Sequence, residues 1–174
     1  MNKTSFFKST LKQGIIMGLA FCLYTTLMWL TKLDTTYLSI GQYVDMAIIL
    51  LPIVMIFWAI KQETNSYRVS IIQRIGIAIF VSAISYLIYN PFLYTYHHFI
   101  NPDWFGAVLD LKEIELTAVN VPQEEITATL ENMKTSSVAQ ADLFRLSSLI
   151  PSVVVIPSLV ALLSLIFIKN KVKG

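Results

Sequence analysis

The stretch Ile75–Tyr96, IGIAIFVSAISYLIYNPFLYTY, decides the fold, because its 22 residues include no charged side chain. A helix rises 1.5 Å per residue, so this stretch would be about 33 Å long and would cross a ~30 Å hydrocarbon core. Backbone polar groups in lipid must pair within the segment, which favours a helix over a strand. The sequence therefore predicts a transmembrane helix here.

Three further stretches without any Asp, Glu, Lys, Arg or His are Gly14–Thr31, Met46–Ile60 and Leu146–Ile168. Together they predict an all-α integral membrane protein with four transmembrane helices. We expect these spans at about 13–32, 43–61, 72–97 and 146–168. The second stretch has only 15 uncharged residues, so a re-entrant or buried helix is the alternative there.

The composition supports one membrane domain over residues 1–174. Charged residues make up 14% of the chain, against about 25% in soluble domains, and mean hydropathy is +0.64. These values exclude a disordered chain and a basic nucleic-acid-binding domain. Cys22 is the single cysteine, so an intrachain disulfide is excluded as well. The expected partners are the lipid bilayer and either another membrane protein or further copies of the chain, with no nucleic acid.

The basic residues predict the orientation. With four spans, nine of the 13 Lys and Arg residues fall on the side that carries both termini. Ten of the 11 acidic residues fall on the opposite side, and Glu63 is the exception. The positive-inside rule then places both termini in the cytoplasm.

The 49-residue connection 97–145 predicts structure outside the membrane, because an irregular loop of that length is rare in a compact protein. Ile126, Leu130 and Met133 share one face of a helix at about 122–135. A second helix is expected at about 103–118, although a strand there is an alternative. The stripe expected on this second helix consists of Trp104, Ala107, Leu111, Ile114 and Ala118. We therefore expect a helical extracytoplasmic insertion over about 101–144, which either caps the bundle or binds a partner.

Three segments resemble a known family. They are Gly14–Gly18 (GIIMG), Tyr94–Asp103 (YTYHHFINPD) and Val121–Ile126 (VPQEEI). With this order of spans they resemble the bacterial membrane family called domain of unknown function 4199. The resemblance implies a small four-helix membrane protein of Gram-negative bacteria, so the expected location is the inner (plasma) membrane. It implies no activity or site residue.

Small residues and prolines mark expected features of helix packing. Gly14 and Gly18 form a strip that allows close helix approach, either within the chain or in a dimer. Helix kinks are expected at four prolines and one asparagine: Pro52, Asn90, Pro91, Pro151 and Pro157. A break that contacts a transported substrate is the alternative. Asp45 and Arg145, at the outer ends of two spans, are expected to pair.

Catalytic, cofactor and metal sites are expected to be absent. His97, His98 and Asp103 are the only constellation of metal-ligand residue types, and adjacent histidines on a helix point about 100° apart. The uncharged spans also lack the ionisable groups of proton relays. We therefore expect a non-enzymatic membrane component or interaction protein. The alternatives are a small oligomeric transporter or channel subunit and, less favoured, a membrane enzyme.

Overall fold

The computed structural model describes residues 3–138 and 149–170, and every regular element in these ranges is helical. In chain order the elements are α1 (Lys3–Leu30), α2 (Leu38–Ile48), α3 (Leu50–Ser66), α4 (Ile71–Thr95), the wider π-helical turn η1 (Tyr96–Ile100), α5 (Trp104–Ala118), α6 (Gln123–Val138), the π-helical turn η2 (Ile150–Val155) and α8 (Ile156–Phe167). The predicted all-α class is confirmed.

Four helical segments are long and apolar enough to cross a membrane: Ser9–Leu30, Leu38–Ser66, Ile71–Ile100 and Ile150–Phe167. The second is longer than expected, because α2 and α3 continue one another across Ile49. Its 29 residues correspond to about 43 Å, so it exceeds a ~30 Å hydrocarbon core at both ends.

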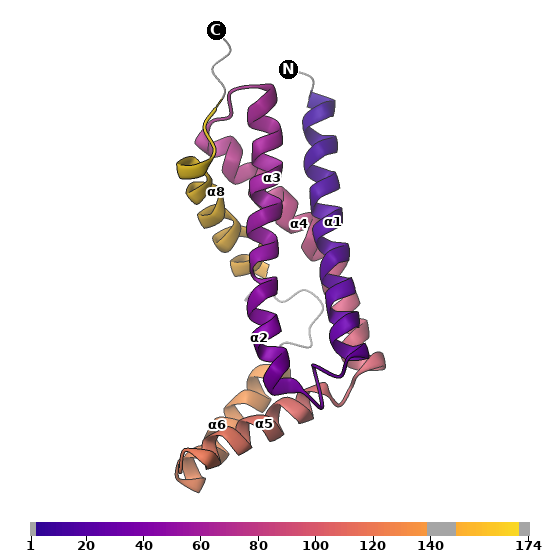
Figure 1. The fold of residues 1–174 in the computed structure, drawn as a ribbon, viewed down its shortest axis with the longest axis vertical. Helices are drawn as coiled ribbons and strands as arrows, with labels where there is room; N and C mark the ends of the chain where they lie inside the picture. The colour runs from indigo at the N-terminus through magenta and orange to yellow at the C-terminus, as the bar shows by residue number, and fades with distance from the viewer. Residues whose placement is uncertain (1–2, 139–148, 171–174) are drawn as a thin grey trace.

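The four segments form one bundle, in which α4 packs against α1, α3 and α8 (Figure 1). The start of α1, the loop 67–70 and the end of α8 lie together, and we call this the terminal end. The loop 31–37, η1 and the pair α5–α6 lie at the opposite, hairpin end. The chain thus passes along the bundle an even number of times, as the sequence predicts.

Apolar side chains fill the centre of the bundle. Ile56, Ile60, Ile77 and Val81, from α3 and α4, are fully buried there. Helices α1 and α4 approach closely because α1 presents glycines. A Cβ atom on Gly14 would lie 2.7 Å from Cβ of Ile84, and one on Gly18 would lie 2.9 Å from Cβ of Ile88. The glycine strip therefore faces α4 of the same chain.

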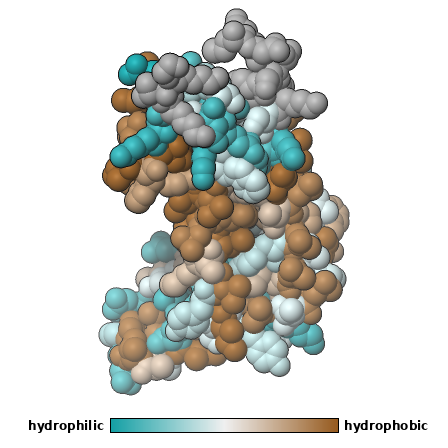
Figure 2. Space-filling model, turned by 45° about the horizontal axis from the view of Figure 1, so that its top comes forward, coloured by the Kyte–Doolittle hydropathy of each residue, from teal (hydrophilic) through white to brown (hydrophobic). Residues whose placement is uncertain are grey.

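Most of the apolar surface of the spans faces outward. Only 22% to 33% of each span's most apolar window is buried within the chain. Large apolar side chains such as Leu23, Val54, Leu87 and Ile166 are more than half exposed. Figure 2 shows hydrophobic surface across the middle of the visible face and hydrophilic groups at the terminal end and over the hairpin. This banding matches a helix bundle immersed in lipid.

Interruptions of regular helix lie close to several of the predicted kink residues. Ile49 separates α2 from α3, three residues before Pro52. Helix α4 continues through Asn90 and Pro91, and η1 begins five residues after Pro91. Pro151 lies within η2, and Pro157 lies in the first turn of α8. Proline removes a backbone donor, which favours such wider turns.

Helices α5 and α6 form a hairpin that lies across the end of the bundle, where α5 contacts α2 (Figure 1). Residues 104–118 are helical, so the strand alternative was wrong. On α6, Ile126 is buried and Leu130 and Met133 are half-buried, as their spacing predicts. On α5 the expected stripe holds at Trp104, Ala107 and Leu111, which are half-buried. It fails at Ile114, which is 65% exposed, and at Ala118, because the last turns of α5 are left uncovered.

Helices α1 and α5 end in the same backbone motif. After α1, the N–H of Leu33 donates to the carbonyl of Met28, and the N–H of Lys32 donates to that of Trp29. After α5, Asn120 and Val121 repeat the pattern. The pivotal residue of this Schellman motif is left-handed, with φ of 58° at Lys32 and 57° at Asn120. Asparagine tolerates this conformation, whereas lysine is strained in it.

Candidate functional site

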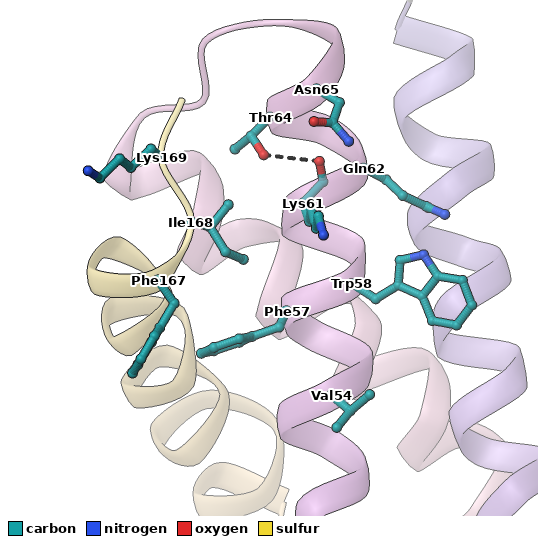
Figure 3. A pocket seen from close by; sticks show the side chains of 10 residues that line it. All are labelled: Val54, Phe57, Trp58, Lys61, Gln62, Thr64, Asn65, Phe167, Ile168 and Lys169. Atoms are coloured by element: carbon teal, nitrogen blue, oxygen red, sulfur yellow. Dashed lines mark hydrogen bonds between the residues drawn. The ribbon is translucent and has the colours of Figure 1, made fainter. Parts of the chain in front are cut away.

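A groove at the terminal end is the candidate site, since it combines a hollow with unpaired charge. It has a volume of about 700 Å³ and lies between α3 and the end of α8 (Figure 3). Its lining is apolar toward the bundle centre and polar toward the chain ends: Val54, Phe57, Trp58, Lys61, Gln62, Thr64, Asn65, Phe167, Ile168 and Lys169.

The α3 side of the groove follows from helical periodicity. Val54, Trp58, Lys61 and Asn65 recur every three or four residues, so they share one face of α3. This face changes from aliphatic through aromatic to charged as the helix nears its end. Phe57 closes the base of the groove against Phe167 of α8, with ring centroids 6.0 Å apart. The groove is therefore amphipathic along its length.

Arg74 fixes the α8 side of the groove. It is 2% exposed, and its Nη1 donates to the carbonyl oxygen of Ser164 at 3.0 Å and to Oγ of Ser164 at 3.1 Å. Its Nη2 donates to the carbonyl oxygen of Ile168 at 2.8 Å. Both carbonyls lie at the C-terminal end of α8, where a cation also stabilises the helix dipole, and that of Ser164 additionally accepts from the N–H of Ile168. Arg74 is therefore a structural cap that holds the end of α8 against α4.

A second contact fixes the chain after α8. The side chain of Asn170 accepts from the N–H of Val69 and donates to its carbonyl oxygen, both at 3.1 Å. The segment that carries Ile168 and Lys169 is thereby held beside the loop 67–70. Its position relative to α3 is thus set by hydrogen bonds on both sides.

The two lysines of the groove have no acidic partner among the described residues. An ion pair in this part of the chain joins Lys112 to Glu115 on α5. The acid closest in sequence to Lys61 is Glu63, which is 5% exposed and interacts with Tyr67 and Ser9. Lys61 and Lys169 are both exposed. The groove thus offers two uncompensated positive charges beside an apolar floor.

The hairpin end contains a closed polar cluster instead. Asp34, Tyr96 and Asn101 are 6%, 2% and 7% exposed. The hydroxyl of Tyr96 donates to Oδ2 of Asp34, and Nδ2 of Asn101 donates to the same oxygen at 3.0 Å. The loop 31–37 reaches this position because Gly41 lets it approach α2. A Cβ on Gly41 would lie 2.0 Å from the carbonyl oxygen of Leu33.

Burial raises the pKa of Asp34 above its ordinary value, and the hydrogen bond from Asn101 opposes that rise. Its second oxygen, Oδ1, is buried without a hydrogen-bond partner in the described part of the chain. A proton on Oδ1 would remove the cost of an unpaired buried charge. The cluster therefore ties loop 31–37 to η1 and is sensitive to protonation.

The structure separates the contacts of His97, His98 and Asp103. The ring of His97 contacts that of Trp104 at a tilt of 42°, with ring centroids 4.6 Å apart, whereas His98 stacks on Tyr94 at 4.1 Å. Asp103 precedes α5 and makes no capping hydrogen bond with its side chain. Within residues 3–138 and 149–170, no three His, Cys, Asp or Glu side chains gather in a way that could hold a metal.

The expected pair of Asp45 and Arg145 lies partly outside the described residues, because Arg145 is not among them. Asp45 belongs to α2, and its Oδ1 accepts a hydrogen bond from the hydroxyl of Tyr24 on α1 at 2.5 Å. This contact joins α1 to α2 near the hairpin end.

Neither the groove nor the polar cluster was identified from the sequence. From the sequence, Lys61 and Lys169 were recognised only among the basic residues that orient the spans. Trp58, one turn before Lys61, could have indicated a site at the membrane interface, where tryptophan is enriched. Asn101 belonged to the segment that carried the family resemblance, but its partner Asp34 is 67 residues away. No periodicity links two such distant positions.

Comparisons with known proteins identify the family of the chain. The comparison with curated proteins and the comparison with solved structures both found no match. A family model described as protein of unknown function, DUF4199, matches residues 12–170, and the protein therefore belongs to this family, as its sequence predicted.

Proposed function

We propose that the protein is a non-enzymatic, multi-pass membrane component that works by binding lipids and other membrane proteins. The observation that carries this proposal is the uncovered apolar surface of the spans. Each span buries at most 33% of its most apolar window within the chain, so the remaining surface requires lipid or neighbouring helices. Membrane helices associate through packing and interhelical hydrogen bonds, for which this surface is available.

The location proposed is the bacterial inner membrane, with both termini in the cytoplasm. The start of α1 and the end of α8 share the terminal end (Figure 1). The basic residues of the segments that meet there are Lys12 of α1, Lys61 near the end of α3, Arg68 of the loop 67–70 and Lys169 after α8. The hairpin at the other end carries the acidic residues of α5 and α6. The positive-inside rule supports this orientation.

Two features of the bundle support a binding role over transport or catalysis. Buried aliphatic side chains occupy the space between α3 and α4, where a pathway for a polar solute would need polar groups. The rings of His97 and His98, the residues of the enzyme alternative, contact separate aromatic neighbours, Trp104 and Tyr94.

Affinity purification from native membranes in mild detergent, followed by mass spectrometry, tests the proposal. We expect a stoichiometric membrane protein, or a second copy of the chain, to be retained with bound lipid. The same preparation is then reconstituted into sealed vesicles. Solute flux in these vesicles, together with a chain that purifies as a monomer, would contradict the proposal and favour a transporter.

A further inference from the structure

We propose that the groove between α3 and α8 is a binding site for one anionic phospholipid. The phosphate would lie between Lys61 and Lys169, and an acyl chain would lie along Val54, Phe57 and Phe167. This inference rests on the proposed membrane embedding and is independent of which end faces the cytoplasm.

The charges of the groove match an anionic headgroup. Lys61 projects from the outer face of α3, and Lys169 follows the end of α8, on the far side of Ile168 (Figure 3). Neither ammonium has an acidic partner in the described part of the chain. The Lys169 ammonium points away from α3 in Figure 3, but its exposed side chain can rotate toward the groove. Lys61 is therefore the principal contact.

The depth of Lys61 fits the phosphate level of a bilayer. The segment Leu38–Ser66 exceeds the hydrocarbon core by about 13 Å, or about 7 Å at each end if it is centred. Lys61 lies five residues before Ser66, about 7 Å along the helix. Its backbone is thus level with the boundary between acyl chains and headgroups.

The remaining lining completes an amphipathic site. Trp58 lies one turn deeper than Lys61, and its side chain is 52% exposed, as in the aromatic belts of membrane proteins. Asn65 offers an amide donor near Lys61, whereas Val54 and Phe57 continue the groove into the apolar region. The side chain of Gln62 turns toward α1, where its Oε1 accepts hydrogen bonds from Ser9 and Gln13 (Figure 3). Free phosphate would use only the polar half. The apolar half therefore favours a phospholipid as the occupant.

Native mass spectrometry of the full chain in detergent tests the site. The protein is titrated with phosphatidylglycerol, with phosphatidylcholine and, as a third arm, with inorganic phosphate. The test variant is Lys61→Gln, and the matched control is Lys12→Gln, an exposed lysine of α1 that does not line the groove. One lysine near an anionic surface corresponds to about fivefold in affinity. Flotation with neutral vesicles separately measures membrane embedding.

We expect one molecule of phosphatidylglycerol to bind more tightly than phosphatidylcholine. Lys61→Gln should weaken this binding about fivefold, Lys61→Arg should restore it, and Lys169→Gln should weaken it further in the double variant. The lipid site would be overturned if both lipids bound with equal affinity, or if inorganic phosphate bound as tightly as phosphatidylglycerol. It would also be overturned if Lys61→Gln and Lys12→Gln lost equal affinity. Failure to float with vesicles would instead contradict the proposed membrane function.

Discussion

The two ends of the bundle differ in whether their polar side chains are bonded within the chain. At the hairpin end, Asp34, Tyr96 and Asn101 are buried and bond to one another. At the terminal end, Arg74 is also buried and bonded within the chain, but Lys61 and Lys169 remain exposed beside a groove. One end is therefore closed by its own side chains, whereas the other keeps charges available for a ligand.

The difference shows that polar residues near the ends of spans have two distinct roles, according to whether the chain itself provides their hydrogen-bond partners. A polar group that the chain satisfies contributes to the fold, because an unpaired buried group is costly. A charge that the chain leaves without a partner at the membrane boundary can bind lipid without disturbing the fold. Substitutions at the closed end should therefore alter stability, and those in the groove should alter binding.

The largest effect is expected at Gly41. In Gly41→Ala the new Cβ would meet the backbone carbonyl of Leu33, so loop 31–37 must move and the hairpin end should open. We expect a loss of about 3 kcal/mol in unfolding free energy, measured by thermal unfolding in detergent.

The controls for Gly41 are Gly76→Ala and Gly106→Ala, where a Cβ would have no neighbour within 4 Å. Alanine has the higher helix propensity, so both should stabilise the protein by about 0.5–1 kcal/mol. Equal losses at all three glycines would show that loop 31–37 does not pack against α2.

Arg74→Gln tests the closed part of the terminal end. The shorter side chain cannot reach the carbonyls of both Ser164 and Ile168, so the last turn of α8 loses its cap. We expect a loss of about 2 kcal/mol in unfolding free energy and weaker lipid binding, because Lys169 is no longer held in place. Arg68→Gln, on the exposed loop, should change stability by less than about 0.5 kcal/mol. Similar losses in both variants would refute the capping role.

The pH dependence of stability tests the polar cluster. Because burial raises the pKa of Asp34, the folded state binds its proton more tightly than the unfolded state does. This contribution to stability is complete below the unfolded pKa, near 3.8, and is lost as the pH rises through the higher folded value. Melting temperatures should therefore fall over this range in the wild type relative to Asp34→Asn. Parallel pH profiles would contradict a raised pKa.

The smallest effect is expected at Lys32, whose φ of 58° is strained for a residue with a side chain. Lys32→Gly should stabilise the protein by up to about 1 kcal/mol in chemical unfolding. Asn120→Gly, at the matching position after α5, should gain less because asparagine tolerates this conformation. A larger gain in unfolding free energy for Asn120→Gly than for Lys32→Gly would contradict the claim that Lys32 is the more strained residue.

The sequence predicted the elements that depend on local pattern. Uncharged stretches identified the four spans, and the spacing of Ile126, Leu130 and Met133 identified the inner face of α6. Ile114 follows a similar spacing on α5, yet it is exposed because the hairpin's neighbours do not extend to it. Periodicity predicts a face of a helix, but tertiary contacts decide whether that face is covered.

The sites depend on contacts that no local pattern encodes. Asp34 meets Tyr96 and Asn101 only after loop 31–37 folds back over Gly41. Lys61 and Lys169 are 108 residues apart and share a groove only because Arg74 and Asn170 hold the end of α8.

The predicted pair between Asp45 and Arg145 remains a prediction, because Arg145 lies outside the described residues.

Labelling with a membrane-impermeant maleimide tests the central claim, that the two ends lie on opposite sides of a membrane. In a Cys22→Ser background, Thr117→Cys places a thiol on α5 and Ser66→Cys places one at the end of α3, both at exposed positions. In intact spheroplasts we predict rapid labelling at residue 117 and labelling at residue 66 only after lysis. Equal labelling of both thiols before lysis would contradict the account.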